Sequence, residues 1–261
     1  MTVITITTDF GHKGPFVAVM KGVILSRYPE AKIVDLMHDI PAQWPPEAGF
    51  WVCRSYRWFP EGSIHLAIVD PGVGTERDIL IVECEGHLFM APDNGLLAQL
   101  LDTAASARIY RLDMARLDLP EPSATFHGRD IFAPVAADLA AGRVSVSDIA
   151  TETRDWIPGW IDEPTAVAGH VSGVIVTVDT FGNLISNIDA TLVEGMAEPV
   201  AEIAGHRVPM LRTYGQAQPG DYLALVNSFG VVEIARAEGD AAEGLGSARG
   251  APLVIRDGYE V

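Results

Sequence analysis

The sequence predicts an N-terminal α/β domain, with a mainly parallel sheet flanked by helices, followed by a smaller all-β, barrel-like domain. In the first part of the chain, short apolar runs alternate with segments of helical periodicity, which is typical of parallel strands joined by helices. Further on, short strands follow one another across glycine-rich turns, with few helical patterns between them. Residues 156–168 have the proline and glycine content of a linker, so the domains are expected at 1–155 and 169–261.

The elements of both domains follow from periodicity and from turn residues. Val17, Met20, Ile24 and Leu25 fall on one face of a helix that Pro29 ends, and Glu85-Gly86 predicts a hairpin turn between two strands. In the N-terminal domain, strands are expected at 2–8, 33–36, 64–69, 79–83, 87–90 and 107–112, and helices at 16–28, 48–57, 94–101 and 129–141. In the C-terminal domain, strands are expected at 169–178, 200–204, 222–227, 231–235 and 252–256.

Composition and charge limit the possible partners. The 261 residues are 48% apolar and 20% charged, which is the composition of a globular chain. A net charge of −17 disfavours nucleic acid as a partner, because contacts to phosphates need a basic surface. No apolar run is long enough to span a bilayer and no signal peptide is recognisable, so no membrane association is expected. Cys53 and Cys84 have the character of buried free thiols, which favours a reducing cytoplasmic location.

The most informative segment surrounds Asp70. A predicted buried strand, 64–69, runs into Asp70-Pro71-Gly72-Val73-Gly74, where the glycines can adopt positive φ. The resulting tight loop leaves Asp70 at the carboxyl edge of the sheet, where α/β proteins bind ligands, and lets Arg77 fold back towards it. The structural alternative is a polar turn closed by a surface ion pair.

Two further polar segments interrupt apolar sequence in the N-terminal domain. His127 lies just before a predicted helix, where it is either a catalytic group or a packed or capping residue, and Arg129 and Asp130 suit the first turn of that helix. Asp9 ends the first strand, where its carboxylate can accept hydrogen bonds from the two hydroxyls of a ribose. The alternative for Asp9 is an N-cap of the following helix.

The C-terminal domain offers two candidate segments, each with a turn as its alternative. Asp179, Phe181 and Asn183 follow a predicted strand and supply an acid for an ammonium group, an aromatic face for a base and an amide for the edge of that base. Asn227 and Ser228 end another strand, where the hydroxyl can meet a carboxylate.

Familiar nucleotide and metal motifs are missing from the sequence. There is no P-loop, no GxGxxG after a strand and no GxSxG elbow. The histidines at 12, 38, 65 and 87 lack the spacing of metal ligands, so no metal site is expected.

Taken together, these segments resemble the S-adenosylmethionine (SAM) hydroxide adenosyltransferase family, which is related to the SAM-dependent fluorinase and chlorinase. The matching segments, in order along nearly the whole chain, are Thr8-Asp9-Phe10-Gly11, Asp70-Pro71-Gly72-Val73-Gly74, Ala91-Pro92-Asp93-Asn94-Gly95-Leu96-Leu97, Phe126-His127-Gly128-Arg129-Asp130, Asp179 with Phe181-Gly182-Asn183, and Asn227-Ser228. The resemblance implies an α/β domain followed by a β domain. It also implies a homotrimer that holds SAM at the subunit interfaces, between the N-terminal domain of one subunit and the C-terminal domain of the next.

The resemblance also implies a role for each site residue. The catalytic residues are Asp70, Arg77 and His127, and the substrate-binding residues are Asp9, Trp44, Phe126, Gly128, Asp179, Phe181, Asn183, Tyr214, Asn227 and Ser228. Asp9 is expected to grip the ribose, Trp44 and Tyr214 to flank the nucleoside, and Phe181 and Asn183 to contact adenine. Asp179 is expected to hold the ammonium group and Ser228 the carboxylate. Phe229 stands where the fluorinase has an arginine, and Arg236 is a possible substitute.

The implied reaction is hydrolysis of SAM by attack of an activated water on ribose C5′, giving adenosine and L-methionine without a cofactor. Arg77 stays charged and favours hydroxide, His127 either takes the proton or holds the water, and Asp70 orients both. The halogenases have a tyrosine where Asp70 stands, and the fluorinase has a serine at the position of Gly128. The alternatives are a chlorinase-like halogenase, a non-catalytic SAM- or adenosine-binding protein and, more distantly, a metallohydrolase.

Overall fold

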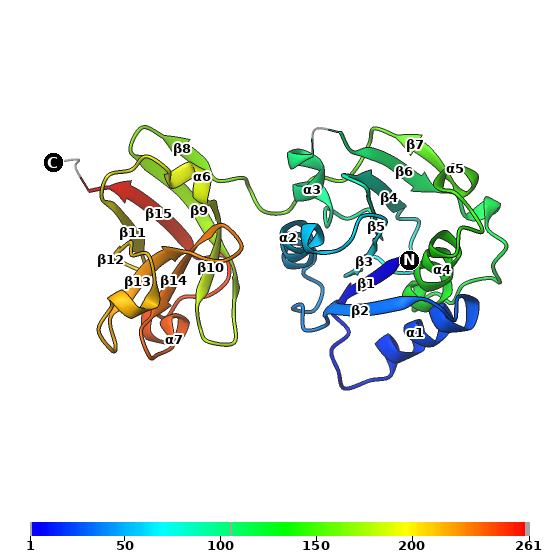
Figure 1. Cartoon of the computed structure of the whole chain (residues 1–261), viewed down its shortest axis with the longest axis horizontal. Helices are drawn as coiled ribbons and strands as arrows, with labels where there is room; N and C mark the ends of the chain where they lie inside the picture. The colour runs from blue at the N-terminus through cyan, green and yellow to red at the C-terminus, as the bar shows by residue number, and fades with distance from the viewer. Residues whose placement is uncertain (1, 105, 259–261) are drawn as a thin grey trace. The chain divides into compact units, whose positions relative to one another are not determined.

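The computed structural model describes residues 2–104 and 106–258 and divides the chain into two compact units, Met1–Trp160 and Ile161–Val261 (Figure 1). The division falls inside the segment 156–168 that was expected to be a linker, but this segment also contains a strand, β8 (Thr165–Val167). Among the described residues, no helix is both long enough and apolar enough to cross a membrane.

The first unit contains a seven-stranded mixed sheet in the order β2-β1-β3-β5-β4-β6-β7. The strands are β1 (Val3–Thr8), β2 (Lys32–Met37), β3 (Ile64–Ile68), β4 (Ile79–Cys84), β5 (His87–Pro92), β6 (Arg108–Leu112) and β7 (Ala150–Thr153). Strands β2, β1, β3 and β5 are mutually parallel, whereas β4 pairs antiparallel with β5 and β6, and β6 pairs antiparallel with β7. The expectation of a mainly parallel sheet is therefore wrong. The two-residue turn at Glu85 and Gly86, both with positive φ, reverses the chain and forces β4 and β5 to run in opposite directions.

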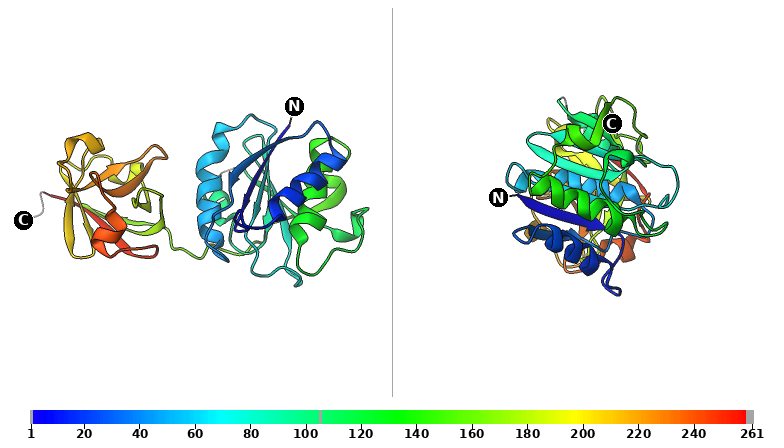
Figure 2. Two further views of the ribbon diagram at one scale, coloured as in Figure 1. Left: turned by 90° about the horizontal axis from the view of Figure 1, so that it is seen from below. Right: turned by 90° about the vertical axis from the view of Figure 1, so that its right-hand side faces the viewer.

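Helices pack in two groups on the two faces of this sheet, as Figure 2 shows in its left view. The helices are α1 (Phe16–Arg27), α2 (Pro45–Ser55), α3 (Ala98–Thr103), α4 (Ala133–Ala140) and α5 (Val146–Ile149), with short turns η1 (Tyr56–Trp58), η2 (Met114–Arg116) and η3 (Gly128–Phe132). One core joins α1, α4 and α5 to Ile4 and Ile6 of β1. The other joins α2 and α3 to Ala67 of β3 and to Val69, which follows β3. Burial of apolar surface on both faces holds β1 and β3 in the centre of the unit.

The second unit is an eight-stranded antiparallel sheet in the order β12-β11-β15-β9-β10-β14-β13, with β8 paired to β9. The remaining elements are β9 (His170–Val178), β10 (Leu184–Asp189), α6 (Ala190–Val193), β11 (Pro199–Ile203), β12 (His206–Pro209), η4 (Tyr214–Gln216), β13 (Tyr222–Val226), β14 (Val231–Arg236), α7 (Ala241–Leu245) and β15 (Pro252–Asp257). A bridge between Met210, next to β12, and Ala224 of β13 nearly closes the sheet into a barrel.

Four strands were not predicted from the sequence: β7 in the first unit and β8, β10 and β12 in the second. Strand β10 carries Ser186 and Asn187, which weaken the apolar pattern of a strand. In the fold these side chains are buried and paired: Ser186 donates to the carbonyl of Val232 at 2.6 Å, and Asn187 accepts from the amide of Val174 at 2.8 Å. Their polarity is satisfied by neighbouring strands that the local sequence does not reveal.

Candidate active site

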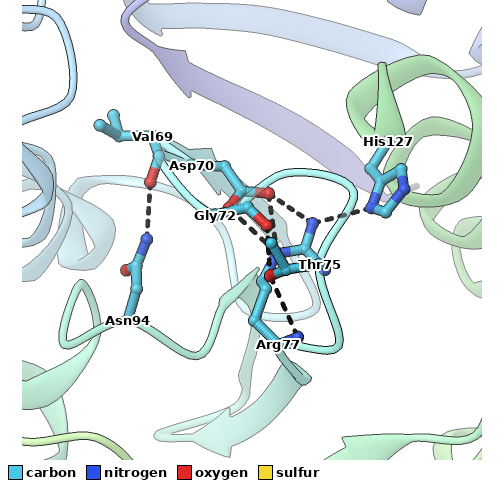
Figure 3. Close-up of polar contacts among 7 residues, drawn as sticks. All are labelled: Val69, Asp70, Gly72, Thr75, Arg77, Asn94 and His127. Carbon is cyan, nitrogen blue, oxygen red and sulfur yellow. Dashed lines mark hydrogen bonds and ion pairs between the residues drawn. The ribbon is translucent and has the colours of Figure 1, made fainter. Parts of the chain in front are cut away.

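The loop after β3 carries Asp70 at the carboxyl edge of the sheet. Thr8, the last residue of β1, pairs with Ile68, so Asp9 and Asp70 follow neighbouring parallel strands at the same edge. Asn94, which follows β5, donates from Nδ2 to the carbonyl of Val69 at 2.9 Å and anchors the start of the loop (Figure 3). Asp70 therefore lies at an edge formed by the ends of three parallel strands, and Asn94 after β5 holds the start of its loop.

Gly74 brings this loop against the segment that leads to His127. Its φ is +79°, and a Cβ at this position would lie 2.1 Å from the carbonyl oxygen of Ala124. Within the loop, the hydroxyl of Thr75 donates to the carbonyl of Gly72 at 2.7 Å. Only glycine permits both this conformation and this approach.

Arg77 lies between Asp70 and His127 and contacts both (Figure 3). Its Nε is 3.0 and 2.9 Å from the two carboxylate oxygens of Asp70, and its Nη2 also pairs with that carboxylate. The same Nη2 lies 2.9 Å from Nδ1 of His127. The side chains of Asp70 and Arg77 are 6% and 11% exposed, and His127 is 9% exposed. The surface ion pair considered as an alternative is therefore wrong, because this pair is largely buried.

The contact with Arg77 determines the protonation of His127. A guanidinium has no lone pair and can only donate, so Nδ1 of His127 must accept, and the proton of the neutral ring resides on Nε2. Burial, followed by the positive charge of Arg77, lowers the pKa of His127. Both effects favour the neutral imidazole.

Phe126 and Gly128, on either side of His127, have packing neighbours in the first unit. The ring of Phe126 makes edge contacts with Phe10 and Phe16, with centroids 5.9 and 5.5 Å apart. A Cβ on Gly128 would lie 3.1 Å from Sδ of Met20, so a larger residue would require a shift of that side chain.

Asp9 and Trp44 also belong to the first unit. Oδ2 of Asp9 accepts from the amide of Gln43 at 2.8 Å. The N-cap alternative for Asp9 is wrong, because the N-cap of α1 is Pro15. The ring of Trp44 makes an edge contact with Trp160 at a centroid distance of 5.7 Å, and Trp160 donates to the carbonyl of Asn94 at 2.8 Å. Trp44 is thus linked through Trp160 to the same turn that anchors the Asp70 loop.

Asp179, Phe181 and Asn183 form a tight turn in the second unit. Oδ1 of Asp179 accepts from the amides of Phe181 and Asn183 at 2.8 and 2.9 Å, and its Oδ2 accepts from Nδ2 of Asn183 at 2.9 Å. The turn leaves the Phe181 ring 77% exposed. A cavity of about 520 Å³ beside it is lined by Phe181, Asn183, Tyr214, Arg236, Ala237, Glu238 and Gly239.

The segment after β13 forms the hairpin turn that was considered for Asn227. Oδ1 of Asn227 accepts from the amide of Phe229 at 2.9 Å, which leaves Ser228 exposed in the turn. Arg236, named as a possible carboxylate-binding residue, donates from Nε to the carbonyl of Gly220 at 3.1 Å and lies over the ring of Tyr222.

Glu233, a buried residue of β14, was not among the predicted site residues, although it contacts two of them. Its Oε1 accepts from the hydroxyl of Tyr214 at 2.6 Å and its Oε2 from Nδ2 of Asn227 at 3.1 Å. A glutamate within the apolar run Val231-Val232-Glu233-Ile234-Ala235 was the available signal, because burying a carboxylate is costly without partners.

The named residues therefore form two groups. Asp9, Trp44, Asp70, Arg77, Phe126, His127 and Gly128 belong to the first unit, and Asp179, Phe181, Asn183, Tyr214, Asn227 and Ser228 to the second. Across residues 2–104 and 106–258, no three His, Cys, Asp or Glu side chains are grouped as metal ligands.

Comparison with known proteins assigns both units to one family. The model of the SAM hydroxide adenosyltransferase N-terminal domain matches residues 4–150, and that of the C-terminal domain matches residues 173–254. A (R)-S-adenosyl-L-methionine hydrolase from Thermus thermophilus is 36% identical over 94% of this chain and 96% of its own. A fluorinase from Actinoplanes is 28% identical over 90% of each chain. The crystal structure of an uncharacterized conserved protein from Thermotoga maritima covers 97% of this chain and 99% of its own, with 30% identity and a TM-score of 0.89.

Proposed function

The chain belongs to the SAM hydroxide adenosyltransferase family, and we propose that it hydrolyses SAM to adenosine and L-methionine. The observation that carries this proposal is the buried, hydrogen-bonded chain from Asp70 through Arg77 to His127. It is supported by relatives that are named SAM hydrolases at 33 to 36% identity. The fluorinase relatives are more distant, at 23 to 28% identity.

The reaction is a displacement at C5′ of the ribose. A water oxygen forms a bond to C5′ as the bond from C5′ to sulfur breaks, and the electron pair of that bond stays on the sulfur of methionine. The water loses one proton to solvent. The sulfonium is a good neutral leaving group, so the proposed reaction uses no metal and no cofactor. SAM itself is the substrate.

Arg77 supplies positive charge beside the attacking water. A guanidinium remains charged at all working pH values and favours hydroxide over water near it. Asp70 holds the guanidinium through its Nε and Nη2 groups, which fixes its orientation. Exclusion of bulk water strengthens this interaction, because charges interact more strongly in a low dielectric.

His127 holds the attacking water in line rather than taking its proton. Nδ1 is engaged by Arg77, so the ring presents Nε2–H, which is a donor and not a base. The Nε2–H group cannot accept a hydrogen bond from water. It can donate a hydrogen bond to the water oxygen and so orient the water. Most of the rate acceleration then comes from positioning and from electrostatics.

The substrate contacts follow the family pattern. Asp9 grips the ribose, Trp44 and Tyr214 flank the nucleoside, and Phe126 and Gly128 complete the wall beside His127. Phe181 and Asn183 contact adenine, Asp179 holds the ammonium group, and Ser228, in the turn made by Asn227, holds the carboxylate. Because these residues come from two units, the proposal includes a homotrimer in which the second unit of a neighbouring subunit completes each site.

The location proposed for this enzyme is the cytoplasm, where SAM is present. It is supported by Cys84, a buried free thiol, as expected in a reducing compartment.

One assay tests the reaction. Purified protein is incubated with SAM in isotopically labelled water, and the label is located. Label in the 5′-hydroxyl of adenosine, with methionine released over many turnovers, is the expected result. Formation of 5′-chloro-5′-deoxyadenosine in the presence of chloride would support the halogenase alternative. Binding of SAM without any methionine release would support a non-catalytic protein, and loss of activity in chelator would support a metallohydrolase.

A further inference from the structure

Glu233 is a buried carboxylate whose hydrogen-bond partners in the described chain are both neutral. It is 3% exposed, and it accepts from the hydroxyl of Tyr214 at 2.6 Å and from Nδ2 of Asn227 at 3.1 Å. Burial, opposed by these two hydrogen bonds and reinforced by the charge of Asp179, raises the pKa of Glu233. A buried charge without a cation is an expensive way to stabilise a sheet, so its contacts need another explanation.

The first of these contacts orients Tyr214. This tyrosine is about half exposed and lies on η4, where its side chain lines the cavity beside Phe181 and Asn183. A half-exposed ring on a short helical turn has freedom about its side-chain torsions. The charge-assisted hydrogen bond from its hydroxyl to Glu233 restricts that freedom and holds the ring in one position.

The second contact fixes the side-chain amide of Asn227. Its Oδ1 accepts from the amides of Phe229 and Val231 at 2.9 and 3.4 Å, so this end of the side chain closes the turn. Nδ2 must then point the other way, towards Glu233. Glu233 therefore holds the turn that presents Ser228 as well as the ring of Tyr214.

We propose that Glu233 is a positioning residue for substrate binding. Its carboxylate holds the ring of Tyr214 and the turn at Asn227 in fixed positions relative to each other. This inference rests on the proposed function, because it assumes that Tyr214 flanks the nucleoside. Glu233 itself does not touch the reacting atoms. Its removal should weaken ligand binding and leave the chemical step nearly unchanged.

The test compares Glu233→Ala, Glu233→Gln and Tyr214→Phe in the full chain. Dissociation constants for adenosine and SAM are measured by calorimetry, and kcat and KM are measured for SAM. Glu233→Ala removes both contacts and should weaken adenosine and SAM about 10-fold each, with kcat within about 3-fold of wild type. Glu233→Gln can accept from Asn227 and donate to the oxygen of Tyr214, so binding should be restored to within about 3-fold.

Tyr214→Phe keeps the ring and removes its anchor, so it should weaken adenosine several-fold even if Glu233→Ala does not fold. The matched control is Glu202→Gln. Glu202 lies on β11 of the same unit and accepts from Arg256 at 2.9 Å, so this change should leave both dissociation constants unchanged.

Three outcomes would overturn the inference. The first is wild-type binding by Glu233→Ala or by Tyr214→Phe. The second is a loss of SAM binding but not adenosine binding in Glu233→Gln, which would assign Glu233 to attraction of the cationic substrate. The third is an equal loss in Glu202→Gln. Failure of the wild-type protein itself to bind adenosine and hydrolyse SAM would instead contradict the proposed function.

Discussion

Nη2 of Arg77 donates to Nδ1 of His127 across 2.9 Å, joining a loop after β3 to the residue that precedes η3. The same guanidinium contacts both oxygens of Asp70. Hydrogen bonds therefore hold the three ionisable side chains in one arrangement, with the guanidinium of Arg77 in the middle. The chemistry expected of each depends on this order, because it leaves Arg77 charged and His127 neutral.

Replacing Arg77 with lysine should separate charge from geometry. Lysine keeps the positive charge but cannot bridge Asp70 and His127 with a planar fork, so kcat should fall about 10²-fold or more while SAM affinity changes little. Steady-state kinetics and calorimetry measure the two effects. Arg57→Lys is the control, because Arg57 makes a similar two-point contact with Glu85 on the surface and should tolerate the change. Equal losses of affinity and rate in Arg77→Lys would mean that Arg77 only shapes the pocket.

The rate should depend on pH through His127. Its folded pKa lies below the ordinary value of 6.5, so the neutral ring persists into mild acid. Protonation of Nδ1 then places a donor against the guanidinium of Arg77 and breaks their hydrogen bond. The profile of kcat against pH should therefore decline on the acid side with a midpoint below 6.5. An inflection at or above 6.5 that disappears in His127→Ala would contradict the lowered pKa of His127.

A buried histidine pair in the first unit should make the fold sensitive to acid. Nδ1 of His65 lies 2.8 Å from the hydroxyl of Thr5, and its Nε2 lies 3.1 Å from Nδ1 of His87. Burial, with a smaller contribution from His87, lowers the pKa of His65 from 6.5 to about 3. Because the folded pKa is depressed, the unfolded chain binds the proton first. The contribution of His65 to the free energy of unfolding is therefore fully present above pH 6.5. It declines as the pH falls towards 3, by about 1.4 kcal/mol per pH unit for one proton.

Denaturant unfolding at several pH values measures this slope. His65→Phe should reduce it, because phenylalanine carries no titratable group and can pack on Phe89, whose ring is 4.9 Å away. His206→Gln, at an exposed position, should leave the slope unchanged. If the free energy of unfolding of His65→Phe depends on pH as steeply as that of wild type, His65 is not the source of the acid sensitivity.

Gly74→Ala should impair catalysis as well as stability. A left-handed backbone costs a non-glycine residue about 1–2 kcal/mol, and the new Cβ would also collide with the carbonyl of Ala124, which lies 2.1 Å away. The Asp70 loop must then move from the segment that carries His127, and kcat should fall. Gly142→Ala is the matched control, because φ is +66° there and nothing lies within 4 Å. Gly142→Ala should lower the free energy of unfolding only by the cost of the left-handed backbone, as measured by thermal unfolding, and its kcat should equal that of wild type. Equal kcat values for Gly74→Ala and Gly142→Ala would contradict the prediction.

Local patterns were sufficient for most elements of the first unit. The helix that ends before Pro29, the hairpin at Glu85-Gly86 and the tight loop after Val69 depend on residues close in sequence, and all three are confirmed. The antiparallel pairing of β6 with β4 and β7 was not expected, and the polar strand β10 was missed. Both depend on which strands lie next to them, and short-range periodicity carries no information about neighbours.

The sequence by itself determined the kinds of chemical group available, the order of the elements and, through ordered motifs, the resemblance to a family. Only the tertiary structure decided that Arg77 meets His127, which lies 50 positions further along the chain, that the imidazole accepts there, and that Glu233 joins Tyr214 to Asn227. The physical reason is that hydrogen bonds act over about 3 Å in space. A separation along the chain becomes a contact only when burial of the two sheet faces and closure of the barrel have brought the strands together.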